Sequence, residues 1–189
     1  MKIHKTPIED LLVLEPTVHQ DERGFFIETY NAKRLESLGI VHDFVQDNHS
    51  KSTHKGTVRG LHLQFEPYAQ TKLVRCSKGA ILDVALDLRE DSPTYLQSFS
   101  VVLSEENKTQ LLVPKGFAHG FMTLEDDTEV MYKVDAYYDK ASDYSLDWQE
   151  PRFNIVWPKL DAFLSDKDAK AASYEQYVKD LKRTREGQR

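Results

Sequence analysis

The chain has 189 residues, 40% of them hydrophobic, and a formal net charge of -6 at pH 7. This length and composition fit one domain with its own core, and the acidic charge argues against sequence-independent binding to DNA or RNA. The single cysteine, Cys76, excludes a disulfide within the chain.

Two features predict the compartment. A lone cysteine fits a reducing environment, and the N-terminal residues lack the apolar run of a signal peptide. No stretch of the sequence is apolar over the length needed to cross a bilayer. We therefore predict a cytoplasmic protein that is not associated with a membrane.

The N-terminal part of the chain combines weak alternation with turn signals. Residues 3–14 predict a first strand, and residues 25–30 predict another that is rich in β-forming residues. Between them, residues 19–24 are polar and end in glycine, which is typical of a turn. Asn31 can cap a short helix near residues 32–38.

The most informative stretch is residues 58–76, which predicts two strands joined by a loop. Alternate side chains of a strand point to opposite faces, so Gly60 and His62 share one face. Nearby cationic residues are Arg59, Lys72 and Arg75. A base near fixed positive charge suits proton abstraction beside a group that becomes an oxyanion. The alternative is a core histidine with a satisfied hydrogen bond.

Residues 43–52 carry a row of polar side chains. Gln46, Asn48 and Ser50 lie two apart, so in an extended segment they face the same way. Such a row could recognise a polar ring such as a nucleobase, or it could be the solvated face of an edge strand.

Residues 80–88 show the clearest alternation of the chain and predict a strand with one apolar face. Asp83 and Asp87 belong to the other face, where they either line a cavity or face water. Further strands are predicted at residues 99–103, 110–113 and 128–138.

The spacing of these short strands indicates the fold class. They recur roughly every 8–12 residues and end at turn residues, which predicts an all-β sandwich or barrel. Tyr132 lies on an apolar face of its predicted strand, where its hydroxyl needs a partner.

The character of the chain changes after Leu160. Ser165 to Asp168 reads as a capping box, and residues 169–185 are rich in helix formers. The local pattern by itself needs Asp168 only as part of that cap.

Several chemistries lack the residues they require. None of the seven histidines forms a His-x-His pair, so we expect no metal site. Motifs for phosphate-binding loops, dinucleotide binding and serine nucleophiles are absent from the sequence. Cys76 lies in a predicted strand without an adjacent base, which favours a core position.

From about Asp21 to Asp168 the sequence resembles the dTDP-4-dehydrorhamnose 3,5-epimerases, jelly-roll enzymes of the cupin superfamily. The resemblance rests on many short motifs in one order, among them Asp-Glu-Arg-Gly-Phe-Phe at residues 21–26 and Val-Arg-Gly-Leu-His at residues 58–62. Other matching segments are residues 45–50, 70–75, 83–89, 92–94, 114–121 and 132–138.

Length and composition predict a single domain over residues 1–189, and the pattern of helix formers predicts a C-terminal helical appendage over residues 159–189. The resemblance implies that residues 1–158 form a jelly-roll, cupin-like β-barrel with N-terminal strands exchanged in a homodimer. It also implies a cofactor-independent isomerase of dTDP-L-rhamnose biosynthesis that inverts C3 and C5 of dTDP-4-keto-6-deoxyglucose.

The resemblance also implies the roles of individual residues. His62 would be the base, Asp168 its carboxylate partner, Lys72 the group that stabilises the oxyanion at O4, and Tyr132 the acid on the opposite face. Substrate-binding residues would be Arg23, Phe26, Glu28, Gln46, Asn48, Arg59, His119 and Tyr138. Exchange of the N-terminal strands would bring the first three to the partner's site.

The sequence departs from the family pattern in one segment. Trp148-Gln149-Glu150-Pro151 stands where relatives show Trp-Asn-Asp-Pro, and Asp143-Tyr144-Ser145 replaces a segment that often carries Glu-Arg-Gly. A single-centre epimerase of another nucleotide-linked 4-keto sugar therefore stays open. So does a non-catalytic nucleotide-sugar binding module, although a binder needs no opposed acid and base.

Overall fold

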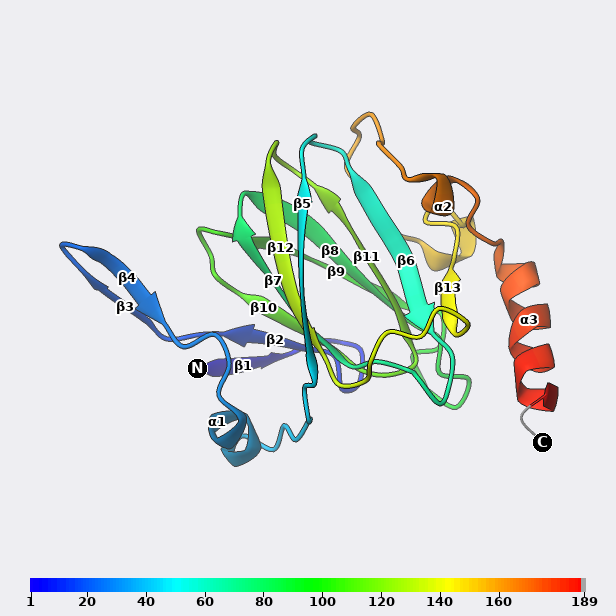
Figure 1. Cartoon of the computed structure of the whole chain (residues 1–189), viewed down its shortest axis with the longest axis horizontal. Helices are drawn as coiled ribbons and strands as arrows, with labels where there is room; N and C mark the ends of the chain where they lie inside the picture. Colours follow the sequence, from blue (N-terminus) through cyan, green and yellow to red (C-terminus); the bar gives the residue numbers. More distant parts are fainter. Residues whose placement is uncertain (188–189) are drawn as a thin grey trace.

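The computed structural model describes residues 1–187, whose regular structure is mainly antiparallel β-sheet (Figure 1). One sheet has the strand order β1 (Lys2–Lys5), β2 (Leu12–Glu15), β10 (Gln110–Val113), β7 (Lys72–Lys78), β12 (Thr128–Val134) and β5 (Gln46–Ser52). The other has the order β13 (Asp143–Ser145), β6 (Val58–Gln64), β11 (Phe117–Thr123), β8 (Ala80–Asp87) and β9 (Ser98–Ser104). A separate hairpin pairs β3 (Val18–Asp21) with β4 (Gly24–Ile27).

The two sheets face each other and share an apolar core. Buried side chains from both sheets meet there, including Val74, Leu111 and Val130 from one and Ile81, Leu103 and Phe117 from the other. The all-β class predicted from strand spacing is confirmed. Each sheet keeps two edge strands, so the sheets form an open sandwich and do not close into a barrel.

Helices are short and peripheral. They are α1 (Ala32–Ser37), the 3-10 turn η1 (Pro151–Phe153), α2 (Asp166–Ala169) and α3 (Tyr174–Gly187). The predicted cap of α1 is confirmed, because Asn31 Oδ1 accepts the Arg34 backbone N–H at 3.1 Å. Within residues 1–187, no helix combines the length and the hydropathy needed to cross a membrane.

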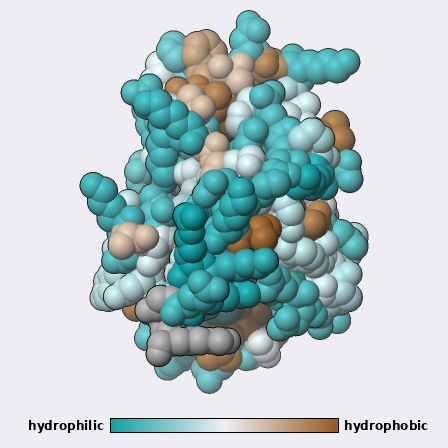
Figure 2. Space-filling view, turned by 90° about the vertical axis from the view of Figure 1, so that its right-hand side faces the viewer, coloured by the Kyte–Doolittle hydropathy of each residue, from teal (hydrophilic) through white to brown (hydrophobic). Residues whose placement is uncertain are grey.

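Helix α3 packs against the outer face of the smaller sheet. Its Tyr177 is buried in a second apolar cluster with Leu63, Val84 and Ala118, and the Tyr177 ring stacks near that of Phe65. The face of the molecule on the α3 side is largely hydrophilic (Figure 2). The helix therefore turns its apolar side inward and its charged side outward.

Both faces of β8 are covered, which decides the question left open for its two carboxylates. Asp83 and Asp87 are fully buried. Asp87 accepts hydrogen bonds from Arg89, Ser92 and Thr94. Burial alone would raise the pKa of Asp87, but these bonds hold it below its ordinary value.

The prediction of one strand over residues 3–14 is wrong. The segment is a hairpin in which β1 and β2 pair, with Ile3 opposite Leu14. The turn between them is closed by Thr6, whose hydroxyl donates to the carbonyls of Ile8 and Leu11 at 2.9 and 2.8 Å. Hydrophobic alternation gives no signal for such a side-chain-stabilised turn.

Two predicted elements also extend too far. Strand β12 ends at Val134, because the next residue, Asp135, turns its carboxylate to the Thr71 backbone N–H at 2.7 Å. The predicted helix over residues 169–185 is broken at Ala172, which forms a parallel bridge with Leu146. The bridge takes the Ala172 backbone out of the helix, so α2 and α3 are separate.

Cys76 lies in the core, as its sequence context predicts. Its thiol donates to the carbonyl of Lys78, at 3.1 Å, from inside the apolar cluster between the sheets. Burial raises the pKa of the thiol to about 11, which keeps it protonated at neutral pH.

Strands β6 and β11 approach so closely at Gly60 that a side chain there has no room. A Cβ at Gly60 would lie 2.6 Å from Gly120 Cα and 2.8 Å from His119 O. The same pairing sets His119 opposite His62 in register. The backbone of β11 therefore fills the space beside Gly60, and this contact fixes the relative positions of two histidines.

We expect Gly60→Ala to destabilise the protein strongly. Gly24 provides a matched control, since both glycines have φ of +124° but a Cβ at Gly24 would meet nothing within 4 Å. Backbone strain should cost each variant about 1–3 kcal/mol, and overpacking should cost Gly60→Ala about 1–3 kcal/mol more. Urea unfolding measures both, and equal losses would contradict the close-approach argument.

Candidate active site

Two connected cavities lie beside β6, β7 and β12. One, of about 440 Å³, is lined by Arg59, His62, Lys72, His119, Tyr132 and Asp168 among others. The other, of about 230 Å³, is lined by Gln46, Asn48, Tyr138 and Asp143. His62, Lys72, Tyr132 and Lys167 line both. The structure thus brings together nine of the twelve site residues predicted from the sequence.

His62 and Asp168 form a close pair. His62 Nε2 lies 2.5 Å from Asp168 Oδ1, and the carboxylate is buried. Ser165 also acts on Asp168: its Oγ donates to Asp168 Oδ2 at 2.9 Å and accepts the Asp168 backbone N–H at 3.1 Å. The capping interpretation is therefore incomplete, because the same residue completes the cap of α2 and contacts the imidazole.

The protonation states of this pair follow from its surroundings. Burial lowers the pKa of His62, although Asp168 acts in the opposite direction. Burial would raise the pKa of Asp168, but its bonds with His62 and Ser165 keep it below its ordinary value. A neutral imidazole beside a charged carboxylate is the state expected of a base that is ready to accept a proton.

Lys72 places an ammonium group in the cavity with little access to water. Its side chain is buried, and burial lowers its pKa to about 8. Asp143 and Asp83 act against this shift, and Lys167 adds to it. Lys72 Nζ also approaches the His62 carbonyl at 3.5 Å. The group is mostly charged at neutral pH, and low local polarity strengthens its effect on a neighbouring anion.

Tyr132 comes from β12 of the larger sheet, whereas His62 comes from β6 of the smaller sheet, and both side chains line the same cavity. Burial raises the pKa of its phenol above the ordinary value, although Arg59 acts against this. The phenol is therefore protonated at neutral pH and can donate a proton or a hydrogen bond.

A second histidine–carboxylate pair lies beside the first. His119 Nε2 is 2.8 Å from Asp83 Oδ1, and both residues are buried. The other oxygen, Asp83 Oδ2, is buried without a hydrogen-bond partner among the described residues. Asp83 is therefore held in the interior beside His119, borders neither of the two cavities and does not face water.

The polar row on the edge strand β5 faces the two cavities: Gln46 and Asn48 line the smaller one and Ser50 the larger one. Gln46 Nε2 donates to Asn48 Oδ1 at 2.9 Å, and Gln46 Oε1 accepts the Tyr138 backbone N–H at 3.3 Å. Arg59 is held at the larger cavity by Ser52 Oγ and the Lys51 carbonyl, both at 3.0 Å.

Three predicted residues lie away from these cavities. Arg23 and Phe26 belong to the β3–β4 hairpin, which projects from the body of the chain (Figure 1). Glu28 follows the hairpin and contacts Asn31 and Arg34. Arg23 is paired with Asp21 only two residues away. Within one chain the structure does not bring these side chains to the site.

The sequence reasoning missed two lining residues that contact each other. Lys167 Nζ lies 2.5 Å from Asp143 Oδ2, and both side chains border the smaller cavity. Two weak signals point to them: Lys167 precedes Asp168, and Asp143 lies in the segment that departs from the family pattern.

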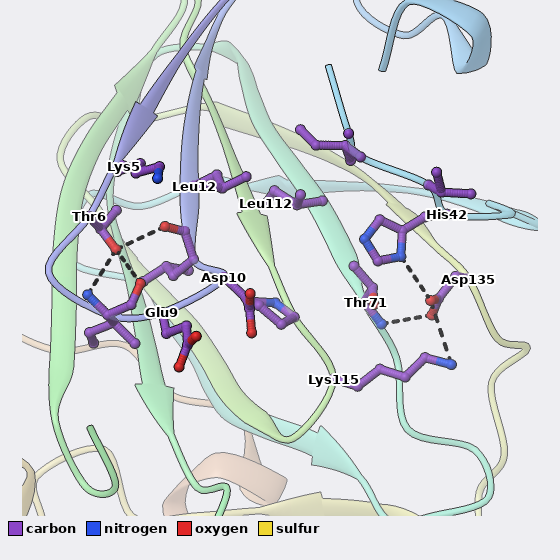
Figure 3. A pocket seen from close by; sticks show the side chains of 16 residues that line it. Lys5, Thr6, Glu9, Asp10, Leu12, His42, Thr71, Leu112, Lys115 and Asp135 are labelled. Carbon is purple, nitrogen blue, oxygen red and sulfur yellow. Dashed lines mark hydrogen bonds and ion pairs between the residues drawn. The ribbon is translucent and has the colours of Figure 1, made fainter. Parts of the chain in front are cut away.

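A larger hollow, of about 800 Å³, lies elsewhere, at the turn between β1 and β2 (Figure 3). Its polar centre is Asp135, which His42 Nδ1 and Lys115 Nζ each approach at 3.6 Å. None of the predicted site residues lines it. No group of three or more His, Cys, Asp or Glu side chains within residues 1–187 is arranged to hold a metal ion.

Fold and site together define a cupin-like β-sandwich enzyme whose cavity is lined by an imidazole, a phenol and a buried ammonium group. The chain belongs to the dTDP-4-dehydrorhamnose 3,5-epimerase family, whose model matches residues 5–176. A relative of that name from Shigella flexneri is 52% identical over 169 residues, covering 89% of this chain and 93% of the relative.

Solved structures agree with this membership. The Bacillus anthracis dTDP-4-dehydrorhamnose 3,5-epimerase, solved with TDP and PPi bound, is 52% identical with a TM-score of 0.89, over 91% of this chain and 98% of that one. The Legionella pneumophila enzyme in complex with dTDP-4-keto-L-rhamnose is 44% identical with a TM-score of 0.91, over 95% and 96% of the two chains.

We expect Asp168→Asn to lower the pKa of His62 further. Burial disfavours the imidazolium, and the variant lacks the negative charge of Asp168 that favours it. Histidine ring NMR across pH 4–8 measures this titration directly. Ser165→Ala is the matched control: losing the cap should cost about 1 kcal/mol of stability while leaving the His62–Asp168 contact in place. An unchanged His62 titration in Asp168→Asn would show that the pair does not govern the base.

Proposed function

We propose that this enzyme is a dTDP-4-dehydrorhamnose 3,5-epimerase, which inverts C3 and C5 of dTDP-4-keto-6-deoxyglucose in dTDP-L-rhamnose biosynthesis. The observation that carries the proposal is the His62–Asp168 pair, which lines one cavity with Lys72 and Tyr132. A non-catalytic binding module would have no use for a base, an acid and a buried cation in one cavity.

The reaction proceeds through an enolate at each centre. Protons at C3 and C5 are both α to the C4 ketone, so His62 can remove either one while the bonding electrons move to O4. Donation from His62 Nε2–H to Asp168 leaves Nδ1 with a lone pair that can accept the proton. The Lys72 ammonium stabilises the negative charge that forms on O4.

Inversion requires the new proton to arrive on the opposite face of the ring. Tyr132 is the donor: its phenol, kept protonated by its raised pKa, gives a proton to the enolate carbon as the C4 carbonyl re-forms. The phenolate then recovers a proton from solvent, and the imidazolium releases the one it took. Each inversion therefore exchanges one carbon-bound hydrogen with water.

The substrate's nucleotide occupies the polar end of the site. Arg59 suits the diphosphate, because a guanidinium fork matches phosphate oxygens. Gln46, Asn48 and Tyr138 suit the thymidine, and His119 borders the sugar. The contacts that hold Gln46 and Arg59 in place support these assignments, since an ordered side chain loses less entropy on binding.

Proton exchange tests the function. In heavy water with dTDP-4-keto-6-deoxyglucose, NMR should show deuterium entering both C3 and C5 with a new configuration. His62→Asn should slow exchange at least about 100-fold, the usual range for loss of a general base. Tyr132→Phe should still exchange but lose inversion, because His62 can return a solvent proton to the same face.

Each other outcome has a definite meaning. Exchange at one carbon only would make this a single-centre epimerase and point to the altered segment at residues 143–151. Unchanged turnover in His62→Asn would overturn the mechanism. If the protein binds thymidine diphosphate tightly but catalyses no exchange, the nucleotide-binding assignment would stand and the proposed sugar substrate would be wrong.

We further propose that the enzyme acts in the cytoplasm as a homodimer whose N-terminal hairpins complete the partner's sites. Phe25 and Phe26 on the hairpin are 58% and 68% exposed, which is unusual for phenylalanine and fits burial by a second copy. Arg23, Phe26 and Glu28 are then available to the partner's cavity. The buried, unpaired Cys76 fits a reducing compartment.

Mixing two inactive variants tests the shared site. If Arg23 serves the partner's site, a mixed dimer of His62→Asn and Arg23→Ala chains contains one intact site and one doubly altered site. Random exchange of subunits should therefore restore about one quarter of wild-type activity. If activity does not recover after subunit exchange has been verified, Arg23 acts in the site of its own chain. If the protein sediments as a monomer, the proposed homodimer is wrong.

A further inference from the structure

The ion pair between Asp143 and Lys167 crosses the junction of the two cavities. Asp143 comes from β13 and borders the smaller cavity, whereas Lys167 comes from α2 and borders both. Their side chains are 16% and 47% exposed, so the carboxylate is the inner partner and the ammonium the outer one. The pair ties α2, which carries Asp168, to the edge strand of the smaller sheet.

Asp143 has further neighbours inside the site. Tyr138 Oη donates to Asp143 Oδ2 at 3.2 Å, the same oxygen that Lys167 contacts. In the β13–β6 ladder, Asp143 lies opposite Gln64, and Ser145 lies opposite His62. The carboxylate is thus held by groups from two other segments and fixed relative to the strand that carries the base.

The buried Lys72 ammonium needs a counter-charge, because a cation moved out of water is stable only beside negative charge. Asp143 on β13 lines the smaller cavity together with Lys72 and Lys167. Asp143 and Asp83 on β8 supply the counter-charge, with Asp143 the stronger, and Lys167 on α2 opposes them. Asp83 is also engaged by His119 of β11. The other titratable or charged groups that line the larger cavity are Arg59 and His62 of β6, Tyr132 of β12 and Asp168 of α2.

We propose that Asp143 is a positioning residue of the epimerase: its carboxylate supplies the counter-charge of the Lys72 ammonium and holds Lys167 across the cavity junction. The inference rests on the function proposed for this site. It gives a role to a residue in the segment that departs from the family pattern. Asp143 acts through Lys72, which is the group that meets the oxyanion.

Because Asp143 and Lys167 carry opposite charges, removing each charge should shift the titration midpoint of Lys72 in opposite directions. Asp143→Asn removes the attraction on Lys72, so its titration should move to lower pH. Lys167→Met removes a repulsion, so the titration should move to higher pH. We expect shifts of about half a pH unit, a threefold change in the charged-to-neutral ratio. Asp143→Glu keeps the charge and should restore the wild-type midpoint.

Lysine side-chain NMR on the free protein measures this titration without substrate. Lysine labelled with ¹³C at Cε reports each midpoint, and Lys72→Met identifies the Lys72 signal. In parallel, the alkaline limb of kcat/KM should move with the Lys72 midpoint in each variant, because this parameter reports groups of the free enzyme. Thermal unfolding establishes that each variant is folded. Because Lys167 is half-exposed, Lys167→Met should perturb folding little and provides a second test of the proposal.

The outcomes separate the two levels of the proposal. Opposite shifts in the two variants, with rescue by Asp143→Glu, support the counter-charge role. A purely structural ion pair predicts that both variants lose activity without opposite shifts, and that result overturns the inference. Wild-type protein that shows the predicted Lys72 titrations but no proton exchange from the keto sugar would overturn the proposed function while leaving the counter-charge in place.

Discussion

Charge buried between two β-sheets is the constraint on which this site depends. An ammonium or carboxylate taken out of water is costly unless a partner and hydrogen bonds replace the lost hydration. The chain pairs His62 with Asp168 and His119 with Asp83, in each case from a different element, and the charges of Asp143 and Asp83 favour the charged form of Lys72. Each pair therefore also connects two elements of the fold.

This arrangement gives the cavity groups their chemical differences. Burial favours neutral forms, so His62 becomes a free base and Tyr132 stays a phenol, whereas Lys72 keeps most of its charge at neutral pH. One physical effect thus prepares a proton acceptor, a proton donor and a stable cation in the same space. The differences between them come from their partners, which the fold supplies from separate strands and from α2.

Much of the fold could be predicted because strands carry local signals. Alternation along residues 80–88 and the polar row of Gln46 and Asn48 depend only on neighbouring side chains, and both appear in the structure as predicted. The family motifs placed His62, Lys72 and Tyr132 correctly beside one cavity. By contrast, the β1–β2 hairpin depends on the bonds of Thr6, and the break before α3 depends on pairing with Leu146, which is distant in sequence. The sequence reasoning missed Asp143 and Lys167 for a similar reason: they contact each other but are distant in sequence, so the residues around each one give no sign of the other.

The burial of Cys76 has a practical consequence for work on this protein. It is the only cysteine of the chain, and its thiol stays protonated far above neutral pH inside the apolar core. Since the thiolate is the species that reacts, alkylating reagents and mild oxidants should leave the folded protein unmodified. A cysteine introduced on the β3–β4 hairpin would then react alone, so a spectroscopic label could report the position of that hairpin without altering any native residue of the core.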